Sequence, residues 1–153
     1  MSNYLPKHLT SKDRRTQRKN LNKSRKLYKK GIYFNRPTIK SFQSKPSPHV
    51  SRACKLYNVS SLTPNALLAK KTKCKLSTLQ KIVKKGEGAS YSSGSRPNQS
   101  AKAWGLARLG SSLTGNKASK YDYHLLKDGC EKTSLALKLA TRRKNNNFVK
   151  DLE

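Results

Sequence analysis

Acidic residues are scarce in this 153-residue sequence, where 7 Asp and Glu stand against 35 Lys and Arg and leave a formal net charge of +28. General acid–base catalysis needs carboxylates or histidines held at the reacting atoms. The neighbouring acids Asp122, Asp128 and Glu131 are explained by helix caps and the helix dipole. The glycine-rich run at Gly86 lacks the GK[ST] ending of a phosphate-binding loop. We therefore predict no enzyme, no cofactor and no small-molecule substrate.

Cysteine and long apolar runs are also sparse. Cys54, Cys74 and Cys130 are widely spaced and form no CxxC pair, which argues against a zinc site. We expect all three to be reduced, partly buried side chains in a cytosolic setting. No apolar stretch approaches the ~18 residues that a membrane-spanning helix requires, so we expect no membrane span.

Basic charge is abundant and graded along the chain. Residues 1–50 hold 14 Lys and Arg with one acid, residues 51–100 hold 10 with one, and residues 101–153 hold 11 with five. Because so much like charge destabilises an isolated compact chain, it implies a polyanion or acidic protein partners. The apolar share of 33% is low for a globular chain. We predict a basic, extended or partly helical arm over 1–49, a small helical domain over 50–145 and a flexible tail over 146–153.

Hydrophobic periodicity and capping residues predict a mainly α fold, a small bundle of short helices. In the first half we expect a helix from Ser11 to Lys30 that forms against a partner, an extended segment over Gly31–Val50 with room for one strand at Thr38–Phe42, and helices at 50–57 and 63–71. The second half is expected to add helices starting at Ser77, at Ser100–Leu113, at 119–127 and at 130–143.

The stretch from Gly86 to Gly115 contains the only tryptophan, Trp104. Gly86 and Gly88 are expected to stop the preceding helix, and Gly115 to terminate the next one in a left-handed conformation. Gly110 lies on the apolar face of that next helix, and because an interior glycine costs roughly 1 kcal/mol against alanine, it indicates close packing against the backbone. Two interpretations stay open: a core helix with an aromatic anchor, or a docking surface centred on Trp104 and Arg108.

The run YSSGSRPNQSAKAWGLARLGSSLTGNKAS resembles the signature of a family of small basic proteins encoded by nucleocytoplasmic large DNA viruses, of the phycodnavirus and mimivirus type. The matching residues are Ser92 to Gln99, Trp104, Arg108, Leu109, Thr114, Gly115, Ala118 and Asp122. Asn116 stands where that family often has a second glycine, and a weaker likeness reaches back to about Lys40. The resemblance implies a viral setting but carries no chemistry of its own.

Candidate partner-binding residues fall into two sets. Aromatic and arginine side chains are expected either to anchor the chain in grooves of neighbouring proteins or to stack on unpaired bases; they are Tyr33, Phe34, Arg36, Phe42, Arg96, Trp104 and Arg108. Basic side chains are expected to face a polyanion; they are Arg14, Arg15, Arg18, Lys19, Lys70, Lys71, Lys73 and Lys75.

Resemblance and composition together favour a structural virion protein. We expect a minor capsid protein made in the host cytoplasm that cements the inner face of an icosahedral shell, with the major capsid protein and other minor capsid proteins as partners and DNA as a further one. One alternative is a virion core protein that condenses DNA without sequence preference. A second alternative is a ribosomal-type RNA scaffold protein. Condensation requires basic residues gathered on one outward face, whereas cementing requires the aromatic arm to be buried in protein.

Overall fold

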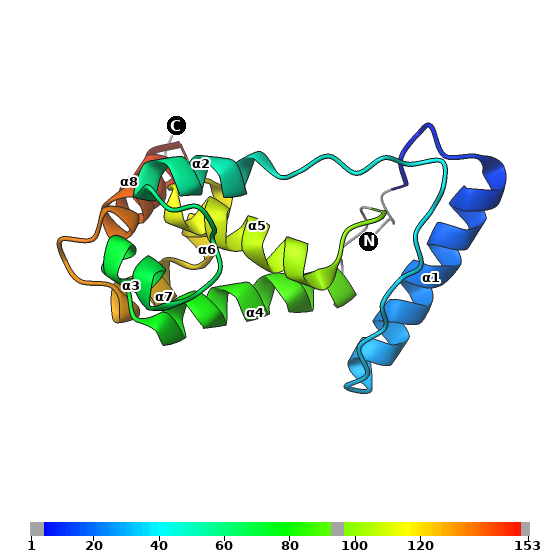
Figure 1. Ribbon diagram of the computed structural model, residues 1–153, viewed down its shortest axis with the longest axis horizontal. Helices are drawn as coiled ribbons and strands as arrows, with labels where there is room; N and C mark the ends of the chain where they lie inside the picture. Colours follow the sequence, from blue (N-terminus) through cyan, green and yellow to red (C-terminus); the bar gives the residue numbers. More distant parts are fainter. Residues whose placement is uncertain (1–4, 93–96, 151–153) are drawn as a thin grey trace. The chain divides into compact units, whose positions relative to one another are not determined.

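The computed structural model describes residues 5–92 and 97–150 and is mainly α-helical, as the sequence predicts. Its helices are α1 (Ser11–Lys29), α2 (Pro48–Tyr57), α3 (Ala66–Thr72), α4 (Leu76–Ser92), α5 (Ala101–Leu113), α6 (Lys117–Tyr121), α7 (Tyr123–Gly129) and α8 (Leu135–Lys150) (Figure 1). Within these described ranges there is no strand, only an isolated antiparallel bridge between Cys74 and Cys130. No described helix combines the length and apolarity needed to cross a membrane.

The chain divides into two compact units. The first comprises residues 1–46 and 87–104, and the second comprises residues 47–86 and 105–153. The predicted boundary after residue 49 lies close to the change at 46/47. The first unit nevertheless contains more than the predicted arm, because the end of α4 and the start of α5 belong to it.

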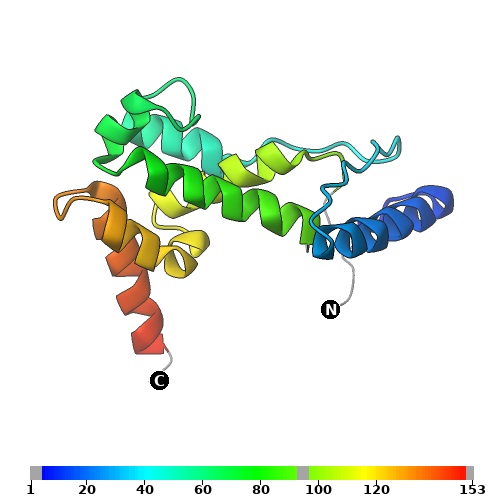
Figure 2. The same ribbon diagram turned by 90° about the horizontal axis from the view of Figure 1, so that it is seen from below.

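A single apolar cluster forms the core of the second unit. Its members come from α2, α3, α4, α5, α7 and α8 and from the loops on either side of α3: Ala53, Tyr57, Leu62, Leu68, Cys74, Leu79, Ile82, Leu109, Leu113, Leu126, Ala136 and Ala140. The Tyr57 hydroxyl donates a hydrogen bond to the Leu113 carbonyl at 2.5 Å, and burial raises the pKa of this phenol. Figure 2 shows α6 and α7 beside α8, with which both are in contact.

Cys74 and Cys130 are joined by a disulfide, so the expectation of three reduced cysteines is wrong. The two residues also form the isolated bridge, in which the Lys75 amide donates to the Gly129 carbonyl at 2.8 Å and the Glu131 amide donates to the Lys73 carbonyl at 2.9 Å. The disulfide therefore fixes the turn between α3 and α4 to the turn between α7 and α8. Cys54 is free and half-buried.

Gly110 confirms the expected close packing. A Cβ atom at this position would lie 2.5 Å from the carbonyl oxygen of His49, at the start of α2. Backbone therefore occupies the space that any side chain would need. Gly115 ends the segment after α5 with a positive φ of 71°, also as predicted.

Asp122 does not cap a helix with its side chain, contrary to the sequence-based interpretation. It is fully buried between α6 and α7, and its carboxylate accepts hydrogen bonds from Arg108 Nη2 at 2.7 Å, Arg108 Nε at 3.0 Å and Ser112 Oγ at 2.7 Å. The buried carboxylate therefore has a two-pronged ion pair and a hydroxyl donor, which is what a buried charge requires.

Several predicted helix ends differ from the structure. Helix α4 continues through Gly86 and Gly88 and does not stop there. A Cβ at Gly88 would lie 2.8 Å from the Tyr28 hydroxyl, so the glycine allows the Tyr28 side chain to lie close to the α4 backbone. Helix α3 begins at Ala66 and not at residue 63, because Asn65 caps it with its Oδ1, which accepts from the Leu68 amide at 2.9 Å. Helix α8 starts at Leu135 and extends to Lys150, into the predicted tail, whose residues 151–153 lie outside the described part.

Exposed large apolar helix side chains include Leu67, Tyr121 and Leu135. Leu68, Leu126 and Ala136, in the same or the following helix, are buried. Hydrophobic periodicity does not resolve differences of one helical position or the break between α6 and α7.

The first unit is organised along α1. The N-cap of α1 is Thr10, whose Oγ1 accepts from the Asp13 amide at 3.2 Å. After α1 the chain first runs back along the helix (Figure 1), and residues 32–47 contain neither helix nor strand. Near its start Tyr33 contacts Tyr28, and near its end Ser41 donates to the Asp13 carboxylate from its amide at 3.0 Å and from its hydroxyl at 2.5 Å. These bonds lower the pKa of Asp13.

The strand expected at Thr38–Phe42 is absent from the described structure, because the Asn98 side chain takes the backbone bonds instead. Its Oδ1 accepts from the Ile39 amide at 2.6 Å, and its Nδ2 donates to the carbonyls of Ile39 at 2.8 Å and Phe42 at 2.6 Å. Asn98 has a φ of +60°, a left-handed conformation that asparagine tolerates. Ile39 is buried at this point.

Candidate nucleic-acid interface

Helix α1 carries basic residues on its exposed face. At 100° per residue, seven exposed Lys and Arg side chains fall within about 140° of the helix circumference; they are Lys12, Arg15, Arg18, Lys19, Lys23, Lys26 and Lys29. The opposite side holds the buried residues Gln17, Leu21 and Ser24. The one acid of the helix, Asp13, is turned to Ser41. We call this set of seven side chains the α1 basic face.

The buried side of α1 is anchored to the end of α4. Ser24 Oγ donates to the Tyr91 carbonyl at 2.9 Å, and Arg25 Nε donates to the Ser92 carbonyl at 3.1 Å. Tyr91 also contacts Tyr28 and Tyr33, with ring centroids 6.1 and 5.1 Å away. The helix is therefore held by contacts on one side, which leaves the basic side presented outward.

Three of the four predicted polyanion-facing residues of this helix lie on the α1 basic face: Arg15, Arg18 and Lys19. Arg14 does not, because it is half-buried and its Nη2 donates to the carbonyls of Pro6 at 3.4 Å and Lys7 at 3.2 Å. Its guanidinium holds the segment that leads into the helix.

The other predicted basic set, Lys70, Lys71, Lys73 and Lys75, is exposed and belongs to the second unit. Lys73 has a positive φ of 56° at the end of α3, and its Nζ donates to the Thr133 hydroxyl at 3.4 Å. Lys73 and Lys75 flank the disulfide-bonded Cys74. These lysines are gathered by a turn and not by a continuous helix face.

The predicted aromatic residues of the N-terminal segment contact their own chain. Tyr33 is 64% exposed but packs one side against Tyr28 and Tyr91. Phe34 lies beneath the Lys23 ammonium, with 4.6 Å between the nitrogen and the ring centroid. Phe42 is half-buried, and its carbonyl accepts the bond from Asn98. Sequence reasoning missed Tyr28 and Tyr91 as the partners of Tyr33.

Trp104 and Arg108 lie one turn apart on α5 but have different surroundings. Arg108 is the internal partner of Asp122 in the second unit. Trp104 is half-buried in the first unit, and its indole nitrogen is buried without a hydrogen-bond partner in the described part of the chain. Arg96 lies outside the described residues. The proposed docking surface centred on Trp104 and Arg108 therefore loses the Arg108 guanidinium to an intramolecular ion pair.

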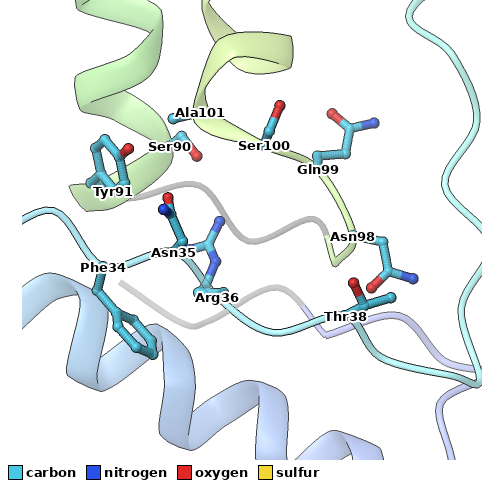
Figure 3. A pocket seen from close by; sticks show the side chains of 10 residues that line it. All are labelled: Phe34, Asn35, Arg36, Thr38, Ser90, Tyr91, Asn98, Gln99, Ser100 and Ala101. Atoms are coloured by element: carbon cyan, nitrogen blue, oxygen red, sulfur yellow. The ribbon is translucent and has the colours of Figure 1, made fainter.

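A pocket of about 280 Å³ lies in the first unit. It is lined by Phe34, Asn35, Arg36, Thr38, Ser90, Tyr91, Asn98, Gln99, Ser100 and Ala101 (Figure 3). These residues come from the segment after α1, the end of α4 and the start of α5. Arg36, a predicted partner-binding residue, is the basic member of the lining and is half-buried.

The charge of the chain greatly exceeds its internal compensation. Even if each of the 7 acids were paired with one cation, 35 − 7 = 28 Lys and Arg would remain. Residues 5–92 and 97–150 contain no group of three or more Cys, His, Asp and Glu side chains placed to hold a metal ion. This excess of positive charge attracts anionic partners.

Comparison with family models identifies the family of this chain. No curated protein and no solved structure matches the chain. The model of a family of unknown function, DUF5824, matches residues 4–129. This match covers most of the sequence, and the chain therefore belongs to that family.

Proposed function

We propose that this chain is a structural protein of large DNA virus particles and that it binds nucleic acid through the α1 basic face. The observation that carries the proposal is the sorting of α1 into one side of seven exposed Lys and Arg and an opposite side anchored to the end of α4. A basic residue set gathered on one outward face is the feature that nucleic-acid condensation requires. The viral setting rests on the resemblance of residues 92–122.

The α1 basic face has dimensions suited to a phosphate backbone. A helix of 19 residues is about 28 Å long at 1.5 Å per residue, and duplex DNA carries one charge per about 1.7 Å of axis. Seven cations on that length release counterions when they neutralise phosphates, and the affinity then falls steeply with salt. Lysine and arginine side chains can contact the phosphates of any sequence, so we propose binding without sequence preference. The protein would then lie inside the particle, on the genome.

A second candidate is the minor capsid protein that cements the inner face of the shell. It is supported by large exposed apolar side chains in both units, Ile32 and Tyr33 in the first and Leu56, Leu67 and Tyr121 in the second. The buried indole nitrogen of Trp104 adds to that support, since a buried donor without a partner is rare in a finished fold. An extended basic arm that threads between capsomers is the finer form of this candidate. Against it, residues 33–42 contact α1, α4 and Asn98 of their own chain.

Localisation in purified particles tests the proposal. Particles are opened, treated with nuclease or with stepped salt, cross-linked in parallel, and examined by mass spectrometry. Release by nuclease or moderate salt, with cross-links from α1 to nucleic acid, is the expected result. Retention on the shell after both treatments, with cross-links from residues 20–50 to the major capsid protein, would establish the cementing role instead. Absence of the chain from particles would refute both.

A competition experiment with DNA and RNA distinguishes genome binding from the ribosomal-type RNA scaffold role. The α1 basic face contacts phosphates, which both polymers carry, so we expect competition by duplex DNA and by RNA at similar phosphate concentrations. A preference of a hundredfold or more for structured RNA would contradict genome binding and support an RNA scaffold role.

A further inference from the structure

The pocket of the first unit has a polar lining without an acidic residue. Besides Arg36, it offers the side chains of Asn35, Thr38, Ser90 and Ser100. In Figure 3, Asn35 and Arg36 project from the segment after α1 toward the ends of α4 and α5, whereas Phe34 points toward α1. The groups that converge here are hydrogen-bond donors and one guanidinium.

The positive charge at the pocket is partly desolvated. Burial lowers the pKa of Arg36, and the nearby charge of Arg25 lowers it further. Two neighbouring cations and removal from water both disfavour a charged guanidinium. An anion bound beside Arg36 would offset both effects, because an opposite charge stabilises the charged guanidinium.

Helix ends around the pocket reinforce this preference. Helix α5, 13 residues long, begins at the pocket, where Ser100 is its capping residue and accepts from the Ala103 amide at 3.1 Å. Its first turn therefore places the positive end of a helix dipole beside Arg36. The negative end of α4 also reaches the pocket, but its carbonyls at Tyr91 and Ser92 accept bonds from Ser24 and Arg25.

We propose that this pocket binds one phosphate group of a single-stranded nucleic acid, with the Arg36 guanidinium and the first turn of α5 as its ligands. A volume of about 280 Å³ is at the lower end of the range for small-ligand pockets, which admits one nucleotide and excludes a duplex. A guanidinium binds phosphate with two parallel hydrogen bonds. The inference rests on the proposed function, in which the α1 basic face brings the strand to the first unit.

The test compares a labelled 20-nucleotide single strand with a 20-base-pair duplex, measured by fluorescence anisotropy on the full chain at fixed salt. Arg36→Gln should weaken single-strand binding about tenfold or more, since hydrogen bonds between charged groups contribute about 1.5–3 kcal/mol, and should change duplex binding less than twofold. Lys45→Gln, an exposed basic position on the same segment, is the matched control and should change both polymers equally and slightly.

A second variant tests the pocket in case Arg36→Gln fails to fold. Asn35 is exposed, so Asn35→Asp is expected to fold as the wild type does, as checked by circular dichroism. The new carboxylate would repel a phosphate in the pocket and should lower single-strand affinity at least as much as Arg36→Gln. Equal losses for single strand and duplex in both pocket variants, or no loss in either, would overturn the inference.

Inorganic phosphate separates this inference from the proposed function. Ligands that bind the folded state raise its unfolding midpoint, so phosphate should raise the midpoint of the wild type more than that of Arg36→Gln, with equimolar chloride as the reference anion. If the chain binds neither polymer, the proposed function falls, and the phosphate difference alone supports the pocket. Equal midpoint shifts in both proteins would refute the pocket.

Discussion

The Asp122 carboxylate lies in the interior of the second unit, where it accepts hydrogen bonds from Arg108 and Ser112. The Asp122 side chain is fully buried, whereas the Arg108 side chain is 25% exposed. The two partners are therefore not equivalent. Loss of the guanidinium leaves a buried charge without compensation, whereas loss of the carboxylate leaves a guanidinium that water already reaches.

We predict that Arg108→Ala lowers the free energy of unfolding by about 3 kcal/mol, the low end of the range for breaking a buried ion pair. Asp122→Asn should cost less, because asparagine has the same shape and still accepts from Ser112. Arg108→Lys, which keeps the charge but not the planar fork, should fall between them. Urea denaturation followed by circular dichroism measures all three. An Asp122→Asn loss larger than that of Arg108→Ala would contradict this account.

Gly110 and Gly88 both sit in helices, but different atoms approach them. At Gly110 the obstacle is the backbone of His49, and at Gly88 it is the end of the Tyr28 side chain, which can move. Alanine gains up to about 1 kcal/mol of helix propensity at either site. The variant obtains this gain only if the atoms that contact the new methyl group can move away.

We therefore expect Gly110→Ala to destabilise the chain by about 1–3 kcal/mol, as overpacking does, and Gly88→Ala to change stability by less than about 1 kcal/mol. Thermal and urea unfolding of the two variants beside the wild type check this contrast. A stabilised Gly110→Ala would show that α2 and α5 are further apart than the structure places them.

The sequence predicted structural features well where they depend on residues that are close together in the chain. The helix at Ala101–Leu113, its Ser100 cap and the left-handed Gly115 all follow from residues within a few positions of one another. Distant contacts escaped the same reasoning. Gly88 is contacted by Tyr28, Cys130 is bonded to Cys74, and Asp122 pairs with Arg108 instead of capping a helix.

For the candidate interface too, the sequence predicted the local features and missed those that depend on distant contacts. The distribution of charge along the sequence predicted the basic arm over residues 1–49. Hydrophobic periodicity missed the buried side of α1, because Gln17 and Ser24 are polar. A spacing of i, i+4, i+7 and i+11 over Gln17, Leu21, Ser24 and Tyr28 was the available signal. Arg14 was misassigned because only the fold shows that its guanidinium binds the Pro6 and Lys7 carbonyls.

At the scale of elements, the disulfide is the covalent link between distant turns. It joins residues 56 positions apart, and a loop of that length corresponds to about 4 kcal/mol in the chain-entropy treatment, with measured values typically about 2–4 kcal/mol. The Lys70–Lys75 lysines lie on one side of this link and α8 follows the other. Reduction should therefore loosen the second unit as a whole.

We predict that Cys74→Ser with Cys130→Ser lowers stability by about 2–4 kcal/mol and that a thiol reductant lowers the unfolding midpoint of the wild type but not of this double variant. Cys54→Ser is the control, because Cys54 is free, and it should keep the response to reductant. A wild type whose unfolding midpoint ignores reductant after mass spectrometry shows complete reduction would contradict the prediction.

For the whole molecule, charge is the dominant property. At least 28 cations have no internal acid to pair with, and such repulsion favours any partner that brings negative charge. The described structure gathers seven of these cations on α1. We infer that the chain acts as a binding module whose partner supplies the missing anions, and that α1 is its main contact surface.

The most direct test is the salt dependence of duplex DNA binding by two matched variants. One replaces Arg15, Arg18, Lys19 and Lys26 of α1 with Gln, and the other replaces the exposed second-unit lysines Lys120, Lys127, Lys132 and Lys138 with Gln. Both lose four charges, so net charge is controlled. Each phosphate contact contributes about 0.9 to the slope of log K against log salt. We predict that the α1 variant loses about 3–4 units of slope and the control less than about 1. Equal losses in the two variants would contradict the account.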